Sequence, residues 1–119
     1  MKFNVGIYIR LSKEDKDNIV SESVKNQKSL LSQYVKENNL NVFDFYIDDG
    51  YSGTNFNRPE FKRLISDIEL KKVNMVITKD MSRLGRDYIE TCNLIEKYFP
   101  TNGVRYVAIT DNIDTYLDN

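Results

Sequence analysis

Four apolar segments alternate with three amphipathic ones along this chain, and that alternation constrains its fold more than any other feature. The apolar segments, which we expect to be β-strands, are residues 3–9, 41–47, 73–78 and 104–109. The amphipathic segments, which we expect to be helices, are residues 21–38, 57–71 and 88–99. Strands that alternate with helices predict an α/β fold, with a mostly parallel sheet of four to five strands between two layers of helices.

Capping residues set the ends of the expected helices. Asn57 can cap the second helix, because Pro59 then falls in its first turn, where proline is tolerated. Pro100 and Gly103 are expected to close the third helix. Residues 110–119 show no apolar period and are expected to form a short polar tail.

The composition excludes several kinds of chemistry. A chain of 119 residues forms one domain, and because it has no histidine it has no Ser-His-Asp triad and no His/Cys zinc site. Its single cysteine, Cys92, cannot form an internal disulfide and fits a reducing, cytoplasmic environment. The apolar runs are too short to span a membrane. A net charge of −1 predicts few, individually placed cations, since a chain that binds nucleic acid by itself is usually basic.

Charged and hydroxyl side chains follow the expected strands at the point where each strand ends. The first strand runs directly into Arg10 and Ser12. In open α/β sheets, ligands bind beyond the carboxyl ends of the strands. The other side chains expected to converge there are Asp49, Arg58, Lys79, Arg83 and Arg86. A serine surrounded by cations predicts a phosphate-binding domain with a serine nucleophile, because arginine donates two parallel hydrogen bonds to phosphate oxygens.

Two of these polar residues have alternative interpretations. Gln27 lies on the core-facing stripe of the first helix, where a buried amide must be hydrogen-bonded. It either tethers the loop after the first strand or holds a phosphate. Arg58 lies at the positive end of the second helix, where a cation is unfavourable unless an anion binds there too. It either takes part in an anion site or points to solvent.

The acidic residues near the strand ends also have more than one interpretation. Asp48 and Asp49 either form a turn and pair with arginines, or hold Mg²⁺ together with Lys79 in a phospho-acceptor or phosphate-sensing domain of flavodoxin-like topology. Asp87 lies four residues after Arg83, a spacing typical of an ordinary ion pair on a helix.

Five short blocks of this sequence resemble the signature of the serine site-specific recombinases, the resolvase/invertase superfamily. The blocks are Tyr8–Ser12, Gln27, Asp49–Gly53, Asn57–Pro59 and Ser82–Asp87. They match in order and spacing over nearly the whole chain. The Tyr-Ser-Gly-Thr loop, followed by Arg-Pro-Glu-Phe, is most similar to the large serine recombinases of mobile elements and phages. The resemblance implies a resolvase-like catalytic domain that acts in transposon or phage integration and excision.

The resemblance also implies a role for each matching residue. Ser12 is the nucleophile that attacks a DNA phosphate and forms a covalent 5′-phosphoserine link. The phosphate-contacting arginines are Arg10, Arg58, Arg83 and Arg86, Gln27 is the active-site glutamine, and Asp49 is a carboxylate that orders the arginines. No metal or cofactor is expected, and the expected partners are DNA and further copies of the protein, in a dimer and a synaptic tetramer.

One position departs from the family pattern. Resolvases usually carry aspartate immediately before the first arginine of the Arg83 block, whereas this chain has Ser82 there and Asp80 two residues earlier. Ser82 is expected to cap the turn and to accept a hydrogen bond from Arg83. Residues 1–119 are expected to be the catalytic domain alone, without the long dimer helix and DNA-binding domains of the family, and therefore inactive in recombination by themselves.

Overall fold

The computed structural model describes residues 2–11, 24–49, 58–85 and 87–116. Its elements are β1 (Asn4–Leu11), α2 (Val24–Glu37), β2 (Asn41–Asp49), α3 (Pro59–Glu69), β3 (Met75–Thr78), the 3-10 turn η2 (Met81–Arg83), α4 (Tyr88–Asn93), the π-helical turn η3 (Leu94–Tyr98), α5 (Phe99–Thr101), β4 (Arg105–Ala108) and β5 (Ile113–Asp114). The predicted α/β fold is confirmed.

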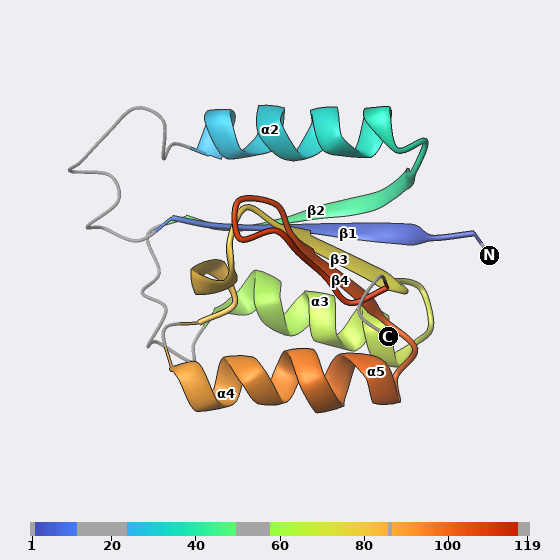
Figure 1. Ribbon diagram of the computed structural model, residues 1–119, viewed down its shortest axis with the longest axis vertical. Coiled ribbons are helices and arrows are strands. Elements are labelled where there is room, and N and C mark those ends of the chain that lie inside the picture. Colours follow the sequence, from blue (N-terminus) through green and yellow to red (C-terminus); the bar gives the residue numbers. More distant parts are fainter. Residues whose placement is uncertain (1, 12–23, 50–57, 86, 117–119) are drawn as a thin grey trace.

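The sheet has the strand order β2-β1-β3-β4-β5. The first four strands are parallel and β5 pairs antiparallel with β4. Helix α2 covers one face of the sheet, and α3 and α4–α5 cover the other (Figure 1). Because β1 lies inside the sheet, its carboxyl end has β2 on one side and β3 on the other. Arg10 is in register with Asp48, and Leu11 with Asp49.

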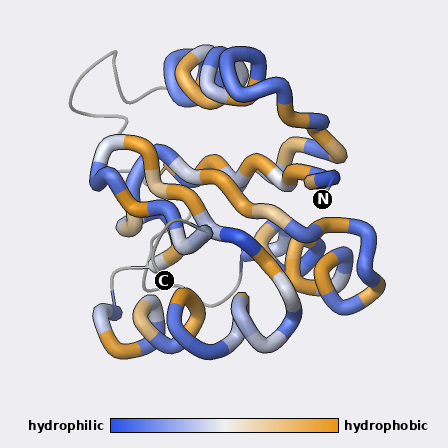
Figure 2. Tube along the Cα trace, turned by 45° about the vertical axis from the view of Figure 1, so that its right-hand side comes forward, coloured by the Kyte–Doolittle hydropathy of each residue, from blue (hydrophilic) through white to orange (hydrophobic). Residues whose placement is uncertain are grey.

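Strand β1 is buried on both faces, and its alternate residues belong to two separate cores. Val5, Ile7 and Ile9 pack with residues of α2, whereas Tyr8 packs with residues of α3 and α5. Figure 2 shows apolar residues along the central strands and alternating polar and apolar positions in the helices. Helix α3 approaches β1 so closely that a Cβ atom on Gly6 would lie 2.8 Å from Leu64 Cδ1. A larger residue at position 6 would therefore require the Leu64 side chain to shift.

Two expectations about the end of the chain were wrong. Part of the expected polar tail forms β5, where Asp114 pairs with Arg105 through two hydrogen bonds of 2.9 and 2.7 Å. The third helix continues through Pro100 to Thr101, because Pro100 lies in the first turn of α5 and follows the π-helical turn η3. Gly103, at a φ of 67°, reverses the chain after the helix. Within the described residues, no helix is long and apolar enough to cross a membrane.

Candidate active site

Arg10, next to the last residue of β1, is one of the largest fully buried side chains of the molecule. Only 1% of it is exposed. Its Nη2 donates to the carbonyl oxygen of Ser82 at 2.6 Å, and its Nε donates to the carbonyl oxygen of Arg83 at 3.3 Å. The carboxyl end of β1 is therefore attached to the turn η2 by a buried cation.

Arg83, the last residue of η2, binds the backbone of β1 in turn. Its Nη1 donates to the carbonyl oxygen of Arg10 at 3.0 Å, and its Nε lies 3.5 Å from Asp80 Oδ1. The residue is 5% exposed. Arg10 in β1 and Arg83 in the turn after β3 thus each bind backbone of the other's segment, and this holds both guanidinium groups at the same sheet edge.

Arg58, the residue before α3, completes the group of buried arginines. Its Nη1 lies 3.3 Å from the carbonyl oxygen of Arg83 and 3.4 Å from the Tyr8 hydroxyl. Its guanidinium carbon lies 4.4 Å from the centre of the Phe61 ring, a distance typical of a cation–π contact. Arg58 is only 7% exposed, so the interpretation that it points to solvent was wrong.

Asp48 caps α3 and binds the Tyr8 hydroxyl, which Arg58 also contacts. Its Oδ1 accepts from the Glu60 amide and its Oδ2 from the Phe61 amide, each at 3.0 Å. Its Oδ2 also accepts from the Tyr8 hydroxyl at 2.9 Å. Burial raises the pKa of Tyr8, so this hydroxyl remains a neutral donor. Asp48 fills the capping role expected of Asn57, a residue outside the described part of the chain.

Three buried positive charges lie close together at the end of β1. We call them the arginine cluster: Arg10, Arg58 and Arg83. Arg10 and Arg58 donate to the same carbonyl oxygen, that of Arg83, at 3.3 Å each. Like charges held this close together repel each other. The N-terminus of α3 adds further positive potential beside Arg58. An anion bound here would relieve the repulsion, and phosphate matches the forked donors of arginine.

Other predicted site residues lie around this cluster. Gln27 is 1% exposed, and its Nε2 donates to the carbonyl oxygen of Arg10, within β1, at 3.4 Å. Asp49 is the exposed last residue of β2. Lys79 follows β3 and is half-buried, and its carbonyl accepts from the Thr110 hydroxyl at 2.9 Å. Ser12 and Arg86 lie outside the described residues, although Ser12 is the residue that directly follows β1.

Sequence reasoning did not assign the role of Asp80. Its side chain, rather than that of Ser82, caps η2 by accepting from the Ser82 amide at 3.1 Å. The same oxygen accepts from the Ser82 hydroxyl. Asp87 caps α4, accepting from the amides of Ile89 and Glu90, instead of serving as the partner expected for Arg83. An aspartate side chain commonly accepts from the backbone amide two residues further along the chain, so this cap could have been expected from the sequence.

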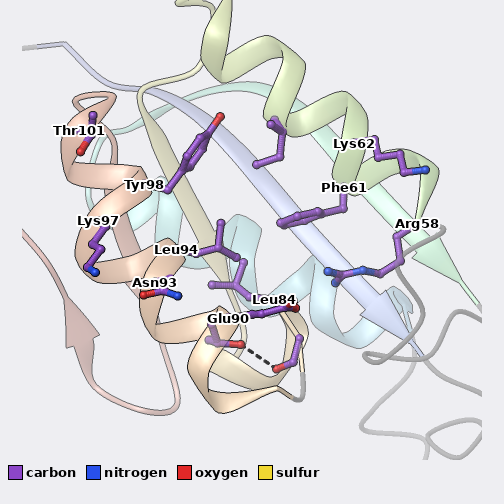
Figure 3. Close-up of a pocket in the computed structure, with 13 residues that line it drawn as sticks. Arg58, Phe61, Lys62, Leu84, Glu90, Asn93, Leu94, Lys97, Tyr98 and Thr101 are labelled. Carbon is purple, nitrogen blue, oxygen red and sulfur yellow. Dashed lines mark hydrogen bonds between the residues drawn. The ribbon is translucent and has the colours of Figure 1, made fainter.

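A groove of about 780 Å³ opens beside the arginine cluster, between α3 and the helix formed by α4, η3 and α5. Its walls are mostly apolar and include Phe61, Ile65 and Leu94. Figure 3 shows the Arg58 guanidinium beside the Phe61 ring at one end, and Thr101 at the other. The groove therefore shares Arg58 with the cluster.

The acidic residues of the described segments do not gather as a metal site would require. No group of three or more Cys, Asp or Glu side chains there could hold a metal ion. Asp48, the first residue of the acidic pair, binds two helix amides and a tyrosine hydroxyl instead, and is 1% exposed. Its arrangement is that of a structural cap.

Comparisons with known proteins identify the family of this chain. The family model described as "Resolvase, N terminal domain" matches residues 5–119. The N-terminal catalytic domain of TP901-1 integrase superposes with a TM-score of 0.84 and 32% identity, covering 95% of this chain and 82% of that one. A resolvase family site-specific recombinase from Streptococcus pneumoniae superposes with a TM-score of 0.81 and 26% identity, covering 99% and 79%.

A phage protein is also similar in sequence. The chain is 35% identical over 66 residues to "Uncharacterized immunity region protein 3" of Bacillus phage phi105, a match that covers 56% of this chain and 79% of that protein. The family match covers nearly all of the chain. The chain therefore belongs to the resolvase family, as a catalytic domain of the serine site-specific recombinases.

Proposed function

We propose that this domain cuts and rejoins DNA through a covalent 5′-phosphoserine intermediate formed on Ser12. The observation that carries the proposal is the arginine cluster: three guanidinium groups, each no more than 7% exposed, converge where β1 ends. Ser12 is the next residue after that strand. A phosphate bound by the cluster would lie close to the segment that carries the serine hydroxyl.

The proposed reaction is an in-line displacement at phosphorus. The Ser12 oxygen forms a bond to phosphorus while the bond to the 3′ oxygen breaks, so the serine gives up its proton and the 3′ oxygen gains one. Charge develops on the phosphate oxygens in the transition state, and fixed guanidinium groups stabilise that charge. Rejoining is the reverse, because the phosphoserine ester conserves the energy of the broken bond. No cofactor is required.

Each remaining site residue has a role in this proposal. Arg10, Arg58 and Arg83 bind the phosphate oxygens, and Arg86 and Lys79 add charge from the segment after β3. Gln27 fixes the end of β1 through the Arg10 carbonyl, at 3.4 Å. Asp49 orders the arginines from the end of β2.

The proposed partners are DNA and further copies of the protein. A net charge of −1 gives this domain little general attraction for DNA, so most of the affinity must come from other parts of the recombinase. We infer that residues 1–119 are the catalytic domain of a longer cytoplasmic protein, which dimerises and forms a synaptic tetramer at its sites during transposon or phage integration and excision. The isolated domain is expected not to recombine DNA.

The test uses the full-length recombinase and a cognate site with a nick that traps the cleaved state. Covalent protein–DNA adduct is expected from the wild type and from the matched control Ser66→Ala, on the exposed surface of α3. No adduct is expected from Ser12→Ala. Adduct that persists in Ser12→Ala would refute the proposal.

A magnesium-dependent phospho-acceptor is the competing function, and the contacts of Asp48 weigh against it. Its two carboxylate oxygens accept from two amides and a hydroxyl, at 2.9 to 3.0 Å. Adduct formation is accordingly expected to proceed at the same rate in EDTA and in Mg²⁺. A rate that depends on Mg²⁺ would favour the competing function.

A further inference from the structure

We propose that Asp80 is a positioning residue of the active site, which holds Arg83 and the turn η2 so that all three members of the arginine cluster face the phosphate. This inference rests on the proposed function, since the phosphate to be faced is the one that Ser12 attacks. Asp80 directly precedes η2, and its side chain is 21% exposed.

The Asp80 carboxylate combines two contacts in one place. Its Oδ1 accepts from the Ser82 amide at 3.1 Å and so caps the turn. The same oxygen lies 3.5 Å from Nε of Arg83, whose side chain is 6% exposed. On its other side, Arg83 donates from Nη1 to the Arg10 carbonyl at 3.0 Å. A planar guanidinium that lies against the Asp80 carboxylate at Nε and donates from Nη1 to the Arg10 carbonyl is oriented by two different segments.

The turn that Asp80 caps carries the acceptors of the other two arginines. The Ser82 carbonyl accepts from Arg10 at 2.6 Å, and the Arg83 carbonyl accepts from both Arg10 and Arg58 at 3.3 Å. A displaced turn would therefore displace the whole cluster. Asp80 acts on Arg10 and Arg58 through the backbone, and on Arg83 directly.

The position of Ser82 shows that the carboxylate can be supplied from a second place. The Ser82 hydroxyl donates to Asp80 Oδ1, so the side chain of residue 82 lies within hydrogen-bond distance of the carboxylate that contacts Arg83. Aspartate at residue 82 would bring its own carboxylate to Arg83. The proposal requires a carboxylate beside Arg83, whichever of the two residues carries it. Moving the carboxylate from residue 80 to residue 82 is therefore expected to preserve adduct formation.

The experiment compares three variants of the full-length recombinase on the nicked site. Asp80→Asn keeps a capping side chain but removes the charge, and adduct formation is expected to slow by about tenfold to a hundredfold, because the close ion pair with Arg83 is lost. Asp80→Asn combined with Ser82→Asp is expected to recover to within about threefold of the wild type. Asp111→Asn is the matched control, since Asp111 accepts from the Met81 amide of the same turn at 2.7 Å. Its rate is expected to be unchanged.

A second readout does not depend on cleavage. In the 119-residue chain, hydrogen exchange at the Arg83 Nε–H, followed by ¹⁵N NMR, is expected to accelerate at least about tenfold in Asp80→Asn and to slow again in the double variant. The role of Asp80 would be overturned if the Arg83 Nε–H of Asp80→Asn exchanged at the wild-type rate. It would also be overturned if Ser82→Asp reversed neither the slower adduct formation nor the faster exchange. If the wild type forms no adduct at all, the proposed function fails, and the exchange rates alone decide whether Asp80 positions Arg83.

Discussion

Two groups of arginines in this domain are bound in opposite ways. Arg63 and Arg105 lie towards the surface, each against carboxylates. Arg63 is 2.8 Å from Asp44 and 2.9 Å from Glu60, and Arg105 is 2.7 Å from Asp114. The arginine cluster lies in the interior, where most of its described contacts are with backbone carbonyls and one acceptor is shared.

Under the proposed function, this difference separates structural cations from those that bind the phosphate. The surface arginines also stack on aromatic rings, Arg63 on Tyr46 and Arg105 on Tyr116, and so serve packing. The cluster holds like charges close together at the end of β1, and their mutual repulsion is unfavourable. A bound phosphate would reduce this repulsion, and the energy gained would contribute to phosphate binding. The same substitution should therefore affect cleavage in the arginine cluster but not in the surface group.

The largest expected effect is on cleavage. Arg10→Gln removes one charge from the cluster and is expected to slow adduct formation by about a hundredfold or more, the usual effect of removing one transition-state donor. Arg105→Gln removes a charge of the other group and is expected to leave the rate unchanged. Adduct kinetics on the nicked site would measure both. Equal losses in the two variants would abolish the distinction between the groups.

The next largest effect is expected on the free energy of unfolding, and it concerns the caps of α3 and α4. Asp48→Ala is expected to lower the free energy of unfolding by about 2–3 kcal/mol, because it leaves buried donors of α3 and Tyr8 without an acceptor. Asp87→Ala removes the cap of α4, which is exposed, and is expected to cost about 1 kcal/mol. Denaturant unfolding would measure both values. Equal costs would show that Asp48 is only an ordinary cap.

A smaller effect is expected from inorganic phosphate. A ligand at about ten times its Kd stabilises a folded protein by about 1.4 kcal/mol. Phosphate is therefore expected to raise the Tm of the wild-type chain, but not that of Arg58→Gln. Arg63→Gln, from the surface group, should retain the increase. The same phosphate-dependent shift in Arg58→Gln would place anion binding outside the cluster.

The smallest expected effect is on acid stability. Burial alone would raise the pKa of the Asp114 carboxyl, but hydrogen bonds from Arg105 and from the Tyr116 amide lower it below its ordinary 3.8. A lowered folded-state pKa stabilises the protein above pH 3.8, and this stabilisation is lost as the pH falls through the folded-state value. Arg105→Gln should remove this contribution, about 1 kcal/mol or less, and flatten the acid limb of the unfolding curve. An unchanged limb would contradict the pairing.

The sequence predicted those parts of the fold that depend on local periodicity. Alternation gave β1, and three- and four-residue spacing gave α2 and α3. Strand β5 was missed because two residues carry no period, and its pairing depends on Arg105 and Asp114 meeting across a turn. The continuation of the third helix past Pro100 was not predicted, because the π-helical turn η3 that precedes it depends on packing and not on local sequence spacing.

The candidate site was predictable as a set of residues but not as a set of contacts. Strand ends and signature blocks pointed to Arg10, Arg58 and Arg83, all of which are buried together. The capping of α3 by Asp48 and of η2 by Asp80 depends on segments that meet only in the folded state. Sequence spacing alone does not show which carboxylate reaches which amide.

The central claim is that the arginine cluster holds a DNA phosphate for attack by Ser12, and the most direct test is to locate the covalent bond. Adduct from the nicked site would be digested with protease and nuclease, and the modified peptide sequenced by mass spectrometry. The account predicts a nucleotide attached through its 5′ phosphate to Ser12. A nucleotide on any other residue, such as a tyrosine, or attached through a 3′ phosphate, would contradict it.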